Sequence, residues 1–118
     1  MARYINGIKL YKTPKVKYSK DNLRNPRSKF HPHVILGEKK VNGKKKLASV
    51  SVTHAKNVPD RVTLKMSKGI REEFYVSSGY YLRNESDYRE SVHNGNYRVS
   101  FTDKKKFLNV LRNGKHYS

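Results

Sequence analysis

The sequence predicts a mainly β fold with a C-terminal helix: a small, curved antiparallel sheet or barrel, preceded by a basic N-terminal arm. Three observations favour this fold. Short apolar segments alternate with polar residues at a period of two, as in strands that bury one face. Asn-Gly pairs, a strong short-range hairpin signal, separate several of these segments. One segment near the C-terminus has helical spacing instead, and 118 residues suffice for one domain with a modest core.

The N-terminal segment, residues 1–29, is expected to form the basic arm, and residues 30–118 the folded domain. Residues 1–29 hold nine Lys and Arg residues and one acid, Asp21. Asn6-Gly7 predicts a type I′ turn in a short hairpin. The rest of the segment has two prolines and little apolar periodicity, so it is expected to wrap on the domain or to order only with a partner. A solvated lead-in without a role is the alternative.

Residues 31–101 supply the strand candidates. Asn42-Gly43 predicts the turn of the first hairpin, and Asn94-Gly95 a turn before the last strand. In most of these segments apolar residues recur at every second position, which predicts an antiparallel sheet with one buried face. The expected strands are 34–36, 47–53, 61–66, 72–76, 79–83 and 96–101.

The C-terminal segment changes to a helical pattern. Its apolar stripe consists of Phe107, Leu108 and Leu111. Thr102 or Asp103 is expected to cap the N-terminus of this helix, and Asn113-Gly114 to end it. The helix is therefore expected to pack on the sheet through the stripe.

The charge of the chain predicts a polyanionic partner. The chain carries 27 Lys and Arg residues against 9 Asp and Glu residues, a formal net charge of +18. Folding does not require so much like charge, and self-repulsion opposes it. Nucleic acid is favoured over an acidic protein or a membrane surface. Cysteine is absent, which excludes disulfides and thiolate metal sites, and without a signal-like or spanning apolar run the protein is expected to be cytoplasmic with no membrane partner.

Two histidines frame the expected first hairpin. If Asn42-Gly43 form a two-residue turn, the register places His31 opposite His54, about 5 Å apart. Thr53 then lies beside both imidazoles. One bulge in the hairpin would shift this register.

These residue types suit metal-free cleavage of RNA, in which the ribose 2′-OH attacks the adjacent phosphate. Histidine exchanges protons near neutral pH, Arg or Lys stabilises the developing charge, and a Thr hydroxyl can bond a phosphate oxygen. The candidate catalytic residues are His54, Thr53, His31 and Arg83. A metal is disfavoured because no carboxylate lies near in the sequence, and no cofactor is expected. The alternative is that the histidines are ordinary residues at strand ends.

Further basic and aromatic residues are expected to bind nucleic acid. Tyr80 and Tyr81 adjoin Arg83 and are suited to stack on unpaired bases, while packing within the sheet is the alternative for either ring. The lysine run at 44–46 would otherwise be a solvated turn. The candidate nucleic-acid-binding residues are Arg27, Lys29, His33, Lys44, Lys45, Lys46, Lys56, Tyr80 and Tyr81.

The order of these segments resembles the opening strands of the MazF/PemK-like toxins. The resemblance lies in "HPHVIL", a turn, "ASVSVTHAK" and "NVPDRVTLKM". Three residues fit the third strand of that family: Pro59, Val62 and Leu64. Arg83 lies in a segment, "LRN", that resembles a later strand, and the C-terminal segment resembles the final helix of the family. The resemblance covers roughly residues 28–114.

The resemblance implies an SH3-like barrel, a metal-independent endoribonuclease that cuts single-stranded RNA, an acidic antitoxin as partner, and a homodimer. Thr53 matches the catalytic Thr of the family, and Arg83 matches its RNA-contacting Arg. His31 stands where the family has its catalytic Arg, and the basic arm replaces the N-terminal strand of the family. Either His31 and His54 act as a rebuilt acid and base, or only RNA binding is retained.

Three functions follow from the sequence: a toxin-like endoribonuclease of a toxin–antitoxin system, a non-catalytic RNA- or DNA-binding module, and an interaction protein for an acidic partner. The first predicts that His54, Thr53, His31 and Arg83 converge and that RNA is cut without a divalent metal. The second predicts binding that weakens steeply with salt and does not depend on His54 or Thr53.

Overall fold

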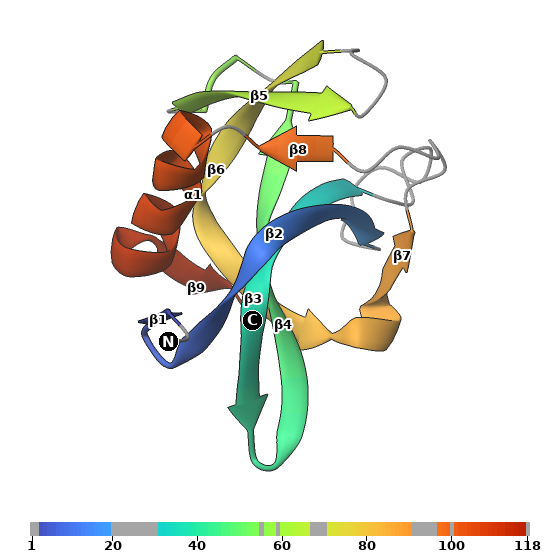
Figure 1. The fold of residues 1–118 in the computed structure, drawn as a ribbon, viewed down its shortest axis with the longest axis vertical. Coiled ribbons are helices and arrows are strands. Elements are labelled where there is room, and N and C mark those ends of the chain that lie inside the picture. Colours follow the sequence, from blue (N-terminus) through green and yellow to red (C-terminus); the bar gives the residue numbers. More distant parts are fainter. Residues whose placement is uncertain are drawn as a thin grey trace.

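The computed structural model describes residues 3–19, 31–54, 56–58, 60–66, 71–90, 97–99 and 101–117. These residues form a mainly β fold with one C-terminal α-helix, as the sequence predicts (Figure 1). The strands are β1 (Tyr4–Ile5), β2 (Ile8–Ser19), β3 (His31–Val41), β4 (Lys44–Thr53), β5 (Asp60–Met66), β6 (Arg71–Asn84), β7 (Tyr88–Glu90), β8 (Tyr97–Val99) and β9 (Lys115–Tyr117). The helices are the short 3-10 helix η1 (Glu85–Asp87) and α1 (Phe101–Asn113).

The strands form one strongly curled sheet with the order β1-β2-β3-β4-β6-β5-β8. Neighbours on this path are antiparallel, whereas β9 joins β6 in parallel. β7 follows β6 through η1 and then pairs with β2, three places away in the sheet. The sheet therefore curls back on itself as a half-barrel, with α1 packed along one side of it (Figure 1).

The main core lies between the sheet and α1. Alternate residues of β4, Ala48, Val50 and Val52, are completely buried, as period-two patterning requires. The predicted stripe of α1 packs against them, and Phe107 and Leu111 of that stripe have no exposed surface. Full burial of such a side chain stabilises the fold by about 1.5–3 kcal/mol, so this contact holds the helix on the sheet.

A second, smaller cluster lies on the other face of the same strands. It contains Ile35, Leu47 and Tyr88, with Tyr11 packed against it. Because the sheet curls, β7 covers residues of β3 and β4 that would face solvent in a flat sheet. Both faces of the central strands are therefore buried, which gives this small domain more core than a single-faced sheet would have.

Both described Asn-Gly pairs form the predicted turns. Asn6 and Gly7 have φ values of 51° and 78°, and Asn42 and Gly43 have 52° and 78°. Positive φ at both central residues is the signature of the type I′ turn, whose twist matches that of the flanking strands. The third predicted turn, at 94–95, lies outside the described residues.

The N-terminal segment differs from the expected arm. Of residues 1–29, those at 3–19 form β1 and β2, and β2 pairs with β3 along much of its length. Ile5, Ile8 and Val16 belong to the main core. Pro14 is accommodated because it falls where the β2–β3 register shifts, so its missing N–H interrupts no regular ladder.

Helix α1 begins one residue before its expected cap. Phe101 is already helical, so neither Thr102 nor Asp103 is the capping residue. The Asp103 carboxylate instead accepts a hydrogen bond from the backbone N–H of Thr63 in β5, at 3.1 Å. Gly114 ends the helix as predicted, and its N–H donates to the carbonyl of Val110 at 2.8 Å.

Candidate nucleic-acid interface

The predicted register of the β3–β4 hairpin is correct near the turn and wrong beyond it. Val41 opposes Lys44 and Gly37 opposes Ala48, as expected for a two-residue turn. A bulge between Ile35 and Gly37 then shifts the pairing by one residue, so that His33 opposes Ser51. Gly37 lies next to this bulge. The backbone of β2 approaches it so closely that a Cβ atom at this position would lie 2.2 Å from a backbone oxygen.

The structure separates Arg83 from the other predicted catalytic residues. His31 pairs with Ser19 of β2 and is shifted out of register with His54. Thr53 and His54 lie at the end of β4, whereas Arg83 of β6 opposes Leu47. Thr53 lies six residue steps along β4 from Leu47, which corresponds to about 20 Å along the strand. His54 is exposed and stacks on Phe74, with ring centroids 4.4 Å apart.

His33 is buried inside the fold instead of facing a ligand. Its side chain has no exposed surface, and its Nδ1 lies 3.0 Å from the hydroxyl of Ser49. That hydroxyl lies 2.6 Å from the hydroxyl of Tyr88, which completes a buried polar chain. Burial lowers the pKa of His33 to about 4, so the imidazole is neutral at pH 7. His33 therefore has a packing role and no surface with which to contact nucleic acid.

The predicted base-stacking tyrosines have partners within the protein. Tyr80 stacks on His116 of β9, with ring centroids 5.1 Å apart and an angle of 12°. Tyr81 contacts Tyr117 of β9 at 5.0 Å, and the guanidinium carbon of Arg83 lies 4.5 Å from the centroid of the Tyr81 ring. Both rings therefore already have contacts with β9.

The lysines at 44–46 of the β3–β4 hairpin differ in their contacts: the one nearest the turn is exposed, and the next two have polar partners. Lys44 is exposed, and Lys45 lies 3.7 Å from Glu38 and 3.6 Å from Glu85. Lys46 donates a hydrogen bond of 2.7 Å to the side chain of Asn84. Such exposed ion pairs contribute little stability, so the lysines remain able to exchange partners.

Three further predicted binding residues have simpler outcomes. Lys56 is exposed in the turn after β4, away from the hairpin tip. Arg27 and Lys29 lie outside the described residues.

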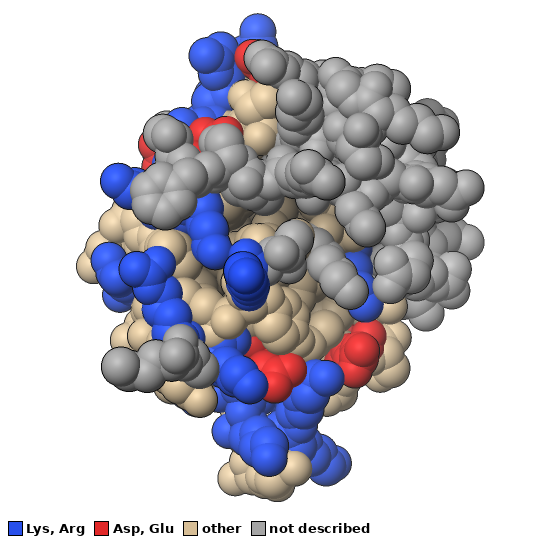
Figure 2. All heavy atoms as spheres, in the orientation of Figure 1, with Lys and Arg blue, Asp and Glu red and all other residues tan. Residues whose placement is uncertain are grey.

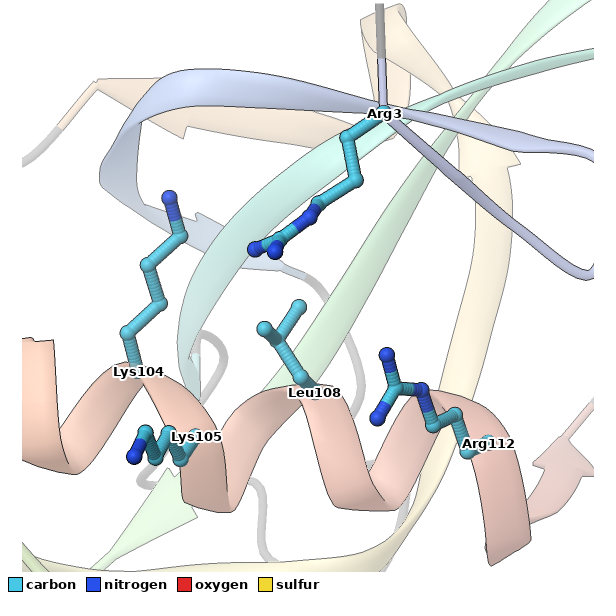
Figure 3. A pocket seen from close by; sticks show the side chains of 5 residues that line it. All are labelled: Arg3, Lys104, Lys105, Leu108 and Arg112. Atoms are coloured by element: carbon cyan, nitrogen blue, oxygen red, sulfur yellow. The ribbon is translucent and has the colours of Figure 1, made fainter.

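Four cations line a pocket that was not predicted from the sequence. It has a volume of about 270 Å³ and lies between the start of the chain and α1 (Figure 3). Its described lining residues are Arg3, Lys104, Lys105, Leu108 and Arg112. Four of these five are cations and none is acidic. Part of the signal was visible, because Lys104, Leu108 and Arg112 recur every four residues and so share one helix face.

Two hydrogen bonds position the N-terminal hairpin on α1 and thereby bring Arg3 to the pocket. The carbonyl of Arg3 accepts a hydrogen bond of 2.9 Å from the N–H of Leu10. The side-chain amide of Asn6 donates to the carbonyl of Leu111 in the last turn of α1, at 2.8 Å. The last turn of a helix leaves such carbonyls without helical partners, so Asn6 supplies one that the helix lacks.

The pocket and the hairpin tip belong to one face of the molecule. Lys and Arg side chains gather over α1 and around the tip of the β3–β4 hairpin (Figure 2). The β1–β2 turn connects these two regions, because Gly7 lies against the side chain of Lys39, whose Cε would be 3.3 Å from a Cβ at that glycine. We call this surface the basic track. It consists of Arg3, Lys39, Lys44, Lys46, Lys104, Lys105 and Arg112.

Among the described residues, no three His, Cys, Asp or Glu side chains lie close enough to hold a metal ion. None of the helices in the described part of the chain is long and apolar enough to cross a membrane. Comparisons with protein-family models, with curated proteins and with solved structures found no match to this chain.

Proposed function

We propose that this protein is a non-catalytic nucleic-acid-binding module that holds a phosphate backbone along the basic track. The observation that carries this proposal is the pocket on α1, which is lined by four cationic side chains and by no described acidic residue. Like charges held this close repel one another, so the arrangement costs the fold stability unless an anion occupies it. A row of phosphates supplies such anions and gains further from the release of its counterions.

The basic track is continuous, so one nucleic acid strand could lie along it. Its two ends, the pocket and the hairpin tip, are joined by the β1–β2 turn, which touches α1 through Asn6 and lies against Lys39. The cations on it come from three separate parts of the chain. Their convergence on one face is not explained by core packing, since most of them are exposed or half-buried.

The test is binding of fluorescent RNA and DNA, single- and double-stranded, measured by anisotropy at several salt concentrations in EDTA. We expect affinity to fall linearly on a log–log plot against salt, with a slope of about 0.7 per neutralised phosphate of a single strand. Replacing two pocket cations, in Lys104→Gln/Arg112→Gln, should weaken binding to every sequence and reduce that slope by about 1.4.

The matched control is Lys56→Gln/Arg61→Gln, which removes two charges at exposed positions outside the track. Its affinity should stay close to that of the wild type. Equal weakening by both double variants would show that net charge, and not the track, determines binding. Binding of an acidic polypeptide but of no nucleic acid would support the acidic-partner hypothesis instead.

The endoribonuclease hypothesis stays a prediction, and the same samples test it. RNA recovered from the EDTA incubations is examined for cuts that end in a 2′,3′-cyclic phosphate. Cleavage by the wild type that is lost in His54→Ala and Thr53→Ala would support the enzyme. Intact RNA, with the same affinity in both variants as in the wild type, would support the binding module.

A further inference from the structure

The pocket concentrates more positive charge than a passing phosphodiester would match. Two guanidinium groups and two ammonium groups line it, and Leu108 is the apolar residue among them. Arg3 and Lys104 extend into the space between the start of the chain and α1, whereas Arg112 lies along the helix beside Leu108 and Lys105 does not point toward the other three (Figure 3). Each guanidinium has a planar fork that can bind two oxygens of one phosphate.

We propose that this pocket binds the terminal phosphomonoester of a nucleic acid strand. The inference rests on the proposed function and names the group that the α1 end of the basic track holds. A backbone phosphodiester carries one negative charge and two non-bridging oxygens. A terminal monoester carries a charge of about −1.5 to −2 at pH 7 and three acceptor oxygens, so it fits two guanidiniums and two lysines better.

The volume of the pocket suits the terminal nucleotide of a nucleic acid strand. At about 270 Å³ it lies just below the range of about 300–1,000 Å³ that small-molecule ligands occupy. A phosphate with its sugar resting on Leu108 would fill such a space, whereas a longer stretch of backbone would not. From there the strand would leave over the β1–β2 turn toward the β3–β4 hairpin.

The position of the lysines on α1 also favours an anion-binding role. Lys104 lies in the first turn of the helix, where the helix dipole favours acidic side chains and disfavours cations. Helix stability therefore does not explain this lysine. A bound dianion would interact favourably with Lys104.

The backbone that carries the pocket residues is held in place by the core and by hydrogen bonds. Phe107 and Leu111, which alternate along α1 with the pocket residues, are completely buried in the main core. Arg3 is fixed by the backbone hydrogen bond to Leu10. The exposed Arg112 can be replaced without touching the core, so a variant at this position tests binding without unfolding the protein.

The experiment compares short RNAs of one sequence that differ only at an end: a 5′-hydroxyl against a 5′-phosphate, and a 3′-hydroxyl against a 3′-phosphate, each labelled at the opposite end. We expect one phosphorylated form to bind wild-type protein about tenfold more tightly than its hydroxyl counterpart. Arg112→Gln and Arg3→Gln should each abolish most of this preference. Lys44→Gln, on the track but outside the pocket, should weaken both forms equally and keep the preference.

The outcomes separate the two proposals. Equal affinity for phosphorylated and hydroxyl ends, with salt-dependent binding intact, would overturn the terminal-phosphate inference and leave the proposed function standing. A preference that survives in both arginine variants would place the terminal phosphate elsewhere and overturn it as well. If the wild type binds neither these RNAs nor any of the RNA and DNA probes used to test the proposed function, both proposals are wrong.

Discussion

At the scale of single residues, the buried chain of His33, Ser49 and Tyr88 shows how a polar group can serve the core. The imidazole packs edge-on against Tyr81 and Tyr88, with centroids 5.1 and 5.9 Å away, and shares a hydrogen bond with the Ser49 hydroxyl. Its neutral form suits this apolar surrounding, and its charged form would lose solvation there. The sequence suggested that His33 binds nucleic acid but could not reveal that its side chain is buried.

This environment predicts that acid destabilises the protein through His33. The folded pKa is about 4 and the ordinary value is 6.5, so between these values the unfolded state binds more protons. The stabilisation is present above pH 6.5 and is lost as the pH falls through 4, by about 3 kcal/mol for this shift. Urea unfolding from pH 7 to pH 4, compared with the non-titrating variant His33→Gln, measures the difference and cancels the contribution of carboxylates.

The exposed His54 supplies the control for that measurement. His54→Gln makes the same substitution at a solvent-exposed histidine outside the buried chain, and so controls for the substitution itself. Parallel pH curves for wild type and His33→Gln would contradict the proposed role of burial.

At the scale of elements, close approaches of the backbone decide the irregular parts of the fold. Gly37 allows the backbone of β2 to approach β3 closely, and Gly79 allows β9 to lie beside β6. Neither contact follows from hydrophobic periodicity, because each involves a strand distant in the sequence. The regular elements, by contrast, follow from local patterns: the Asn-Gly turns, the alternation in β4 and the stripe of α1 were all predicted.

The second prediction concerns Gly79. A Cβ atom there would lie 2.1 Å from the Tyr117 ring and 2.7 Å from the carbonyl oxygen of Lys115. Gly79→Ala should therefore displace β9, lower the unfolding free energy by about 1–3 kcal/mol, and separate the rings of Tyr81 and Tyr117. NMR contacts between these rings and urea unfolding report the two effects.

A glycine in open space serves as the comparison for Gly79. Gly43 has a φ of 78° and nothing within 4 Å of an added Cβ, so Gly43→Ala adds backbone strain of about 1–2 kcal/mol without displacing β9. Retention of the Tyr81–Tyr117 contact in Gly79→Ala would show that β9 does not depend on this close approach.

At the scale of the whole molecule, the net charge of +18 is confined to a small volume. The Cα radius of gyration is 13.5 Å, the size expected of one compact domain of this length. Many of the cations therefore lie within one or two Debye lengths of each other at about 0.1 M salt. Their repulsion opposes folding, and a polyanion on the basic track would relieve it.

The third prediction follows from this confinement. Raising the concentration of a non-binding salt should screen the repulsion and increase the melting temperature, by about 4 °C for each 1 kcal/mol of stabilisation. Calorimetry in sodium chloride measures the effect. Lys104→Gln/Arg112→Gln, which carries two fewer charges, should start at a higher melting temperature in low salt and gain less from added salt. A melting temperature that falls with added chloride would contradict this account.

The sequence by itself determined the mainly β class, the Asn-Gly turns, the stripe of α1 and the excess of positive charge, because each depends on neighbouring residues or on composition. Only the tertiary structure decided the register of His31 and His54, the place of β2 in the sheet and the enclosure of His33. It also decided the meeting of Arg3 with the α1 cations. These features depend on contacts between distant segments, and a single bulge at Gly37 or a hydrogen bond from Asn6 is enough to change them. Local patterns predict elements, whereas the candidate binding site exists because the curled sheet and the N-terminal hairpin bring the two ends of the chain together.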